Sequence, residues 1–315
     1  MKIIGKIILF ICIALIILAA LGYFALRKIW ANMLTAPMAP ENYVMEVMTG
    51  GEIEAKYMAT GGHETAYFEA DYSEDSDIKK IELWYPAELE TSSKKYPVVL
   101  FVNGTGVSAS RYQPVFEHLA SWGFIAIGNE DPSTWEGKKA DATLAWLLTA
   151  NEDESSVFYH KIDTGNIGIT GHSQGGVGVF RAINNTEHKD VYKCAVSLSP
   201  TQEDTAEALK MPYDASQTAI PVMILAGAPN DVISLEALND MFHKISSDIV
   251  IARRSNTDHG QMLYSSDGYV TAWFMWQLQG DMYAAAAFKG DDPEMMRNPL
   301  YQDQLVDLNE VRMVP

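Results

Sequence analysis

Ser173 lies in a segment that could turn an ordinary hydroxyl into a nucleophile. It is the centre of Gly-His-Ser-Gln-Gly, after an apolar run at 166–170 that predicts a buried strand and before a helical segment starting near Val177. Between a strand and a helix, such a serine is typical of a strained turn that lifts the hydroxyl above the sheet. A Cβ at Gly171 or Gly175 is expected to collide with a neighbouring strand or helix. The alternative interpretation is a glycine-rich turn that merely contains a serine.

A histidine and an aspartate complete the set that a nucleophilic serine requires. The serine needs a base to take its proton, and the base needs a carboxylate to hold it in one tautomer. His259 is the candidate base because it follows the last core strand and precedes a glycine, at the same edge of the sheet as Ser173. Asp231 is the candidate acid because it follows an apolar strand through a glycine-containing turn. The order Ser, Asp, His differs from the chymotrypsin-like and subtilisin-like orders.

Other acidic and basic side chains are weaker candidates for these roles. Asp204 and Asp240 are the alternative acids, whereas Asp258 adjoins His259 and could hardly orient its ring. His172 adjoins the nucleophile, and we expect it to pack beside the site because neighbours on such a turn point apart. The remaining histidines are expected before the core of the sheet (His63) or on solvent-facing helix faces and loops: His118, His160, His188 and His243.

Two backbone donors are needed to hold the negatively charged oxygen of a tetrahedral intermediate. The N–H of Gln174, directly after the serine, is the first candidate. The second is expected in the loop after the apolar strand 97–102, where Thr105 is the preferred residue and Gly106 the alternative. Asn103-Gly104-Thr105 also matches a glycosylation acceptor. Its place in a loop at the strand end favours the catalytic interpretation.

The elements that must position these residues alternate between strands and helices. Strand-like segments near 52–59, 64–72 and 78–85 predict an antiparallel lead-in. Further strands are predicted at 97–102, 124–127, 166–170, 194–198, 222–226 and 249–252, and helices at 112–122, 138–150, 177–184, 235–245, 268–278 and 282–288. Repeated β–α units predict a mostly parallel, doubly wound α/β sheet. Residues 199–221 are too few for an inserted lid domain, so an open site is expected.

Aromatic and methionine side chains gather near the predicted edge, and most of them are expected to be core. Trp135 follows a strand end and is a candidate for lining an acyl or aromatic pocket. His172, which is expected to pack beside the site, is the second candidate for contacting the substrate. No lysine or arginine stands out near the serine, so an anionic substrate has no obvious partner. Neither Cys12 nor Cys194 has metal-ligand spacing, and the sequence implies no metal or organic cofactor.

Charge and composition exclude some classes of function. With 315 residues and 48% hydrophobic content, the chain has room for one sizeable α/β domain with an appendage. Residues 1–30 hold four of the 23 basic residues and no acidic one, which leaves 19 basic against 41 acidic residues in the rest. Such an acidic surface repels nucleic acid and anionic lipid heads, so a nucleic-acid partner is not expected.

The appendage is an apolar segment near the N-terminus. Residues 7–26 form an unbroken apolar stretch flanked by basic residues, long enough to span a bilayer. We expect a signal anchor at 1–30, a proline-containing linker at 31–45 and a catalytic domain at 46–315 outside the cytoplasm. A cleaved signal peptide, which would make the protein secreted, is the alternative. The membrane is expected to be a partner through this segment only.

Four segments carry a resemblance to a known superfamily. They are 97–101, 120–127, 168–176 and 258–260. Over about residues 50–290 the chain resembles α/β-hydrolases. Within that superfamily it is similar to the lid-less branch of dienelactone hydrolases, chlorophyllases, platelet-activating-factor acetylhydrolases and cutinase-like polyester hydrolases. The resemblance implies ester hydrolysis by a triad that maps onto Ser173, Asp231 and His259.

The sequence therefore predicts a serine hydrolase that cleaves small-molecule or lipid-like carboxylic esters through an acyl-enzyme. An acyltransferase or an amidase with the same triad is the alternative within enzymes. A surface binding protein on an inactive hydrolase scaffold is the alternative outside them.

Overall fold

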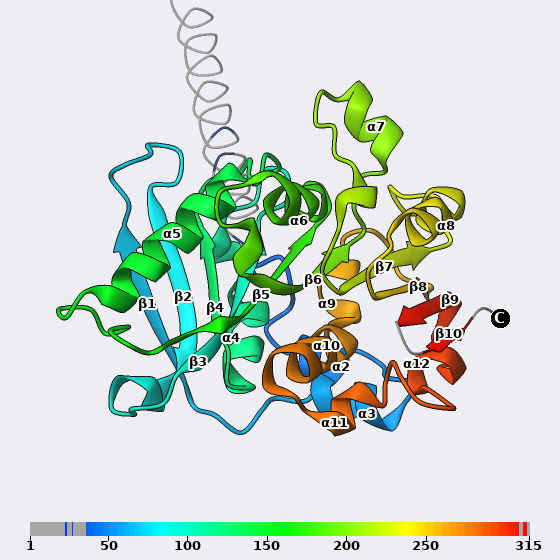
Figure 1. Ribbon diagram of the computed structural model, residues 1–315, viewed down its shortest axis with the longest axis horizontal. Coiled ribbons are helices and arrows are strands. Elements are labelled where there is room, and N and C mark those ends of the chain that lie inside the picture. Colours follow the sequence, from blue (N-terminus) through cyan, green and yellow to red (C-terminus); the bar gives the residue numbers. More distant parts are fainter. Residues whose placement is uncertain (1–22, 24–26, 28–35, 309–310, 314–315) are drawn as a thin grey trace, which may run out of the picture. The chain divides into compact units, whose positions relative to one another are not determined.

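The described strands of the protein form one mixed sheet (Figure 1). The computed structural model describes residues 23, 27, 36–308 and 311–313, and within them the sheet has ten strands in the order β1-β2-β4-β3-β5-β6-β7-β8-β9-β10. These strands are β1 (Thr65–Asp71), β2 (Lys80–Pro86), β3 (Tyr96–Val102), β4 (Ile125–Asn129), β5 (Ile162–His172), β6 (Tyr192–Leu198), β7 (Val222–Ala228), β8 (Ile249–Ser255), β9 (Tyr301–Leu308) and β10 (Val311–Met313). Six neighbouring strands in this order are parallel: β4, β3, β5, β6, β7 and β8. The strands on either side of them pair antiparallel.

Helices cover both faces of this sheet. They are α2 (Tyr43–Glu46), α3 (Glu52–Met58), α4 (Gln113–Ser121), α5 (Lys138–Glu152), α6 (Gln174–Asn185), α7 (Glu203–Ala208), α8 (Leu235–Lys244), α9 (Met262–Ser265), α10 (Asp267–Gln279), α11 (Met282–Ala285) and α12 (Glu294–Arg297). Val99 and Phe101 of β3 share a hydrophobic cluster with α4 and α10, whereas Val98 and Leu100 share another with α5, α6 and α8. Successive residues of a strand point to opposite faces, so these two clusters are the two halves of the core.

The fold class expected from the sequence is confirmed: a mostly parallel doubly wound sheet with antiparallel N-terminal strands. No large lid domain is inserted within the described residues. The stretch 199–221 holds only α7 and a short 3₁₀ turn at Ala215–Gln217. Figure 1 shows α7 standing clear of the sheet at the top of the view.

The predicted strand near 52–59 is wrong, because these residues form helix α3. Ile53 and Tyr57 are four residues apart and both buried, which is the spacing of one helix face. A residue distant in the sequence stabilises the first turn of α3. Glu294 accepts hydrogen bonds from the backbone N–H groups of Ile53 (2.7 Å) and Glu54 (2.8 Å), which satisfies two donors that a helix start leaves open.

The C-terminal part of the sheet was not predicted. Beyond α10, the expected helix at 282–288 ends at Ala285, and β9 then returns antiparallel to β8. Two features make β9 irregular. Asp303 has a positive φ of 58°, and the pairing with β8 shifts register between Ile251 and Arg253. An irregular strand of this kind lacks the clean alternation that marks a half-buried strand.

The chain divides at Pro37 into two units, and all ten described strands belong to the second, Met38–Pro315. The predicted anchor segment at 7–26 lies outside the described residues, except for Tyr23. Among the residues that the structure describes, no helix combines the length and apolar character needed to cross a membrane.

Candidate active site

Ser173 lies in a strained turn between β5 and α6. Its backbone has φ 62° and ψ −123°, a conformation that side chains rarely adopt outside functional turns. The expected role of the two glycines is confirmed, since a Cβ at Gly175 would lie 2.1 Å from the carbonyl oxygen of Val102. One at Gly171 would lie 2.6 Å from the carbonyl oxygen of Gly175. The tight turn therefore places the serine at the start of α6, where the helix dipole favours negative charge.

The structure brings together Ser173, His259 and Asp231 at the C-terminal edge of the parallel strands. Nε2 of His259 lies 2.9 Å from Oγ of Ser173, and its Nδ1 lies 2.8 Å from Oδ1 of Asp231. The His259 side chain is 30% exposed, whereas that of Asp231 is 1% exposed. The imidazole is thus reachable from solvent while the carboxylate behind it is covered.

Backbone and side-chain donors surround the Asp231 carboxylate. Oδ2 accepts hydrogen bonds from the N–H of Gly227 (2.5 Å) and the hydroxyl of Ser199 (2.6 Å), and Oδ1 accepts one from the N–H of Val232 (2.6 Å). Burial alone would raise the pKa of Asp231. The hydrogen bonds from His259, Ser199 and the backbone outweigh it and hold the pKa below the ordinary value. The carboxylate is therefore ionised whenever the imidazole needs a partner.

The candidate substrate-binding residue His172 lies beside the His259 imidazole and is 5% exposed. Its ring centroid is 4.6 Å from that of His259, and its Nε2–H donates to the backbone carbonyl of His259 at 2.7 Å. Burial, followed by the nearby His259, lowers the pKa of His172 to about 4. This geometry makes His172 a neutral support for the loop that carries His259, with little surface left for a substrate.

The loop after β3 presents a free donor beside the nucleophile. The N–H of Gly104 donates to the Tyr112 hydroxyl (2.9 Å), that of Gly106 to the carbonyl of Pro132 (2.9 Å) and that of Val107 to the carbonyl of Gly104 (3.2 Å). Within the described residues, this leaves the N–H of exposed Thr105 without an acceptor. The first N–H of α6, on Gln174, likewise has no partner inside the helix.

Buried Asn103 anchors this loop from beneath. Its side chain is 0% exposed and donates to the carbonyls of Asn129 (2.6 Å) and Asp131 (2.8 Å). Asn103 is therefore not a surface glycosylation acceptor, despite the Asn-Gly-Thr pattern.

Trp135 lies beside α6, one helical turn beyond the nucleophile. The guanidinium of Arg181 lies 5.3 Å from its ring centroid and also bonds to the carbonyls of Glu136 and Pro212. A Cβ at Gly178 would lie 3.3 Å from the Trp135 Cα. No hydrogen bond or ring contact joins Trp135 to Ser173 in the described part of the chain, so its place as a pocket residue stays a prediction.

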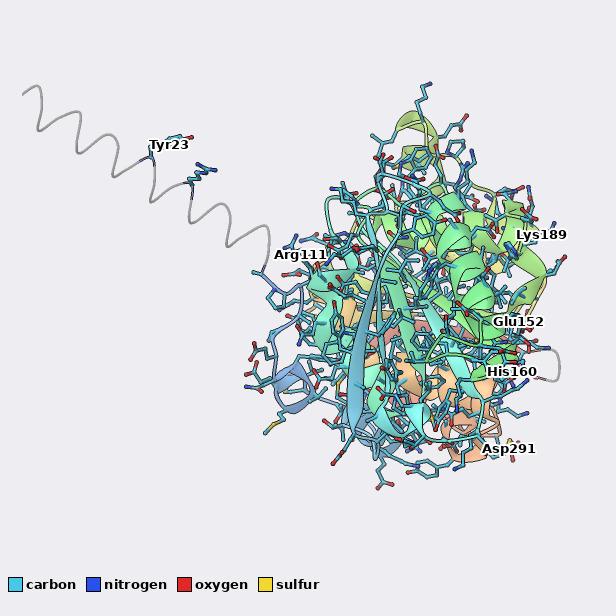
Figure 2. The ribbon with its side chains drawn as sticks, turned by 90° about the vertical axis from the view of Figure 1, so that its left-hand side faces the viewer. Tyr23, Arg111, Glu152, His160, Lys189 and Asp291 are labelled. Carbon is cyan, nitrogen blue, oxygen red and sulfur yellow. The ribbon has the colours of Figure 1, made fainter. Side chains whose placement is uncertain are left out.

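The alternative acids Asp204 and Asp240, and Asp258 next to His259, bond to residues other than His259. Asp240 pairs with Lys244 (2.6 Å), Asp204 accepts from Gln202 (2.7 Å), and Asp258 accepts from the N–H of Gln261 (2.8 Å). Of the histidines expected to face solvent, His160 does so at the surface (Figure 2). The prediction for His118 is wrong, since its side chain is 2% exposed and paired with Asp267.

Sequence reasoning missed two buried hydroxyls at the site. Ser199 directly follows β6 and contacts Asp231, while the Tyr112 hydroxyl accepts a hydrogen bond from the N–H of Gly104, which precedes Thr105. The only available signal for Ser199 was its place after an apolar strand, at the edge where the functional residues gather.

The fold and this arrangement of side chains define an α/β-hydrolase. The family model described as PETase, PET hydrolase-like, matches residues 55–260, more than half of the chain. The chain belongs to this PET hydrolase-like family.

Curated relatives agree with this assignment at low identity. Cutinase est2 from Thermobifida alba is 28% identical over 123 residues, which cover 38% of each chain. Chlorophyllase-1 from Citrus unshiu is 29% identical over 101 residues, or 30% of each chain. A platelet-activating factor acetylhydrolase from Cavia porcellus is 23% identical over 159 residues, covering 35% of this chain and 36% of the relative. In these three comparisons the chain spans between 30% and 38% of the relative's length. They also match the branch of α/β-hydrolases that the sequence motifs indicated.

Proposed function

We propose that this protein hydrolyses carboxylic esters through an acyl-enzyme formed on Ser173. His259 takes the proton of the Ser173 hydroxyl as the oxygen attacks the ester carbon, and Asp231 stabilises the imidazolium that forms. The proton then passes to the leaving alcohol. In the second half of the reaction His259 activates water, which releases the acid and restores the serine.

The oxyanion of each tetrahedral intermediate is assigned to the N–H groups of Thr105 and Gln174. Losing one such donor typically costs about 3–4 kcal/mol of transition-state stabilisation. Small-molecule or lipid-like esters are the proposed substrate class, since no lid domain is inserted within the described residues and the chain is similar to a cutinase and to chlorophyllases.

One observation carries the proposal: the unbroken line of short contacts from Ser173 Oγ through the His259 ring to Asp231. An imidazole that accepts from a hydroxyl on one side and donates to a buried carboxylate on the other is arranged to act as a general base.

A fluorophosphonate probe tests this role directly, because it labels only an activated serine. We expect the wild-type protein to be labelled and Ser173→Ala to remain unlabelled. Equal labelling of both proteins, or of neither, contradicts the proposal. Hydrolysis of p-nitrophenyl esters of increasing acyl length then separates a short-chain esterase from a lipase.

Tethering to a membrane through residues 7–26 is a separate part of the proposal and depends on the apolar sequence alone. The mass of the mature protein and its presence in washed membranes distinguish an anchored protein from a secreted one. A mature chain that begins after residue 26 contradicts the anchor.

A further inference from the structure

Ser199 occupies an unusual position directly behind the catalytic aspartate. It follows the last residue of β6, is 0% exposed, and has a positive φ of 45°. Its N–H donates to the carbonyl of Leu225 in β7 (2.7 Å), which fixes the backbone. Its hydroxyl donates to Oδ2 of Asp231 at 2.6 Å.

The positive φ indicates what this position supplies. Glycine would adopt this conformation without strain, whereas serine has a Cβ that disfavours it. A buried serine held in a strained conformation is best explained by its hydroxyl, since the backbone bond to Leu225 is available to any residue except proline.

The donors to Asp231 divide between its two oxygens. Oδ1 faces His259 and the N–H of Val232, and Oδ2 faces the N–H of Gly227 and the Ser199 hydroxyl. Besides the histidine itself, Ser199 contributes the only side-chain donor among the described residues that contact this carboxylate. Together the donors on Oδ2 prevent rotation that would turn Oδ1 away from the imidazole.

We propose that Ser199 is a positioning residue that fixes the orientation of Asp231 and draws part of its charge away from His259. The inference depends on the proposed esterase function. No proton is transferred, because the hydroxyl donates to Oδ2 throughout the cycle. Its loss should leave Asp231 freer to turn and its charge more available to the protonated imidazole.

The experiment compares two substitutions at Ser199 with a matched control on the same strand. Ser199→Ala removes the hydroxyl, and Ser199→Gly removes it while also relieving the strained φ. Ser197→Ala removes another buried serine, whose hydroxyl donates to the carbonyl of Gly176 (3.1 Å) and does not contact Asp231. Each protein is assayed on a p-nitrophenyl ester across pH, and its melting temperature is measured.

We expect kcat to fall roughly ten- to hundredfold in both Ser199 variants, the range for a lost hydrogen bond to a charged group. KM should change less than about twofold, because the buried hydroxyl does not reach the substrate. The acid limb of the kcat/KM profile should shift from its wild-type position, because the hydroxyl acts on the imidazole only through Asp231. Ser197→Ala should stay within about twofold of the wild-type kcat.

Other results overturn the inference. Ser199 variants with wild-type kcat and an unshifted pH profile show that the hydroxyl does not position Asp231. A fall in kcat that Ser197→Ala shares, together with a lower melting temperature in all three variants, identifies a purely structural effect. An active wild type with unaffected Ser199 variants overturns this inference alone. A wild type that neither turns over ester nor binds the fluorophosphonate probe overturns the proposed function as well.

Discussion

The Asp231–His259 pair and a second pair, Asp267–His118, consist of the same residue types in different surroundings. Nδ1 of the histidine lies 2.8 Å from the carboxylate in the first pair and 2.6 Å in the second. Both aspartate side chains are 1% exposed, but that of His259 is 30% exposed and that of His118 only 2%. Burial of the carboxylate is therefore shared by both pairs, and access to the imidazole distinguishes them.

The partner of the far ring nitrogen decides what each imidazole can do. Nε2 of His259 faces the Ser173 hydroxyl, from which it can accept a proton. Nε2 of His118 lies 3.0 Å from the carbonyl oxygen of Ala59, which can only accept, so this nitrogen must carry a proton. Burial alone would lower the pKa of His118, but Asp267 and the carbonyl acceptors raise it above its ordinary value. These contacts favour the protonated form of His118, whereas the His259 ring faces a hydroxyl from which it can accept a proton.

The largest effect expected from this comparison is on catalysis. Asp231→Asn should lower kcat on a p-nitrophenyl ester by about 10⁴-fold, because the amide favours the wrong imidazole tautomer. Asp267→Asn, the matched change in the second pair, should leave kcat within a few-fold of wild type. Steady-state kinetics at pH 7.5 on both folded variants tests the contrast, and similar losses in the two would break it.

The second effect is on stability, and here the larger loss is expected from the Asp267–His118 pair. His118→Gln leaves Asp267 buried without its ion-pair partner, which should lower the free energy of unfolding by about 3–5 kcal/mol. His259→Gln should cost much less, because the His259 side chain is 30% exposed and water can replace part of what it contacts. Urea denaturation of both variants provides the measurement. Equal midpoints would mean that the buried pair contributes no more than the exposed one.

The smallest effect is on the pH dependence of stability, where His172 and His118 are expected to contribute with opposite signs. Because the pKa of His172 is about 4 in the folded protein, the unfolded chain binds its proton more tightly. Stability from this residue is present above about pH 6.5 and is lost as the pH falls toward 4, by up to about 3 kcal/mol. The raised pKa of His118 has the opposite sign: its contribution is present at low pH and is lost as the pH rises through the folded value.

Denaturation curves between pH 8 and pH 4 test this sign. His172→Asn should flatten the loss of stability on the acid side, whereas His118→Gln should leave the acid-side slope in place. An unchanged slope in His172→Asn would assign the acid sensitivity to other groups.

Local patterns in the sequence predicted the central strands and helices and the three side chains that the structure brings together at the site. Ser173 was found from glycine spacing, and Asp231 and His259 from their places after apolar strands, since strand ends meet at one edge of a parallel sheet. Residues defined by distant partners could not be found in this way. The pattern of its helix predicts that His118 is exposed, yet its side chain is buried against Asp267, 149 positions later in the chain. Ser199 depends likewise on a carboxylate from the next strand.

Strand β9, which was not predicted from the sequence, limits how far the chain can be shortened at its C-terminal end. The family match ends at residue 260, before β9 begins. A chain cut to 55–260 would lose the partner of β8 and separate Arg254, 5% exposed, from its ion-pair partner Glu54. An open strand edge with an unpaired charge beneath it invites aggregation with other copies of the chain. The segment after His259 thus supplies the strand that covers the outer edge of β8.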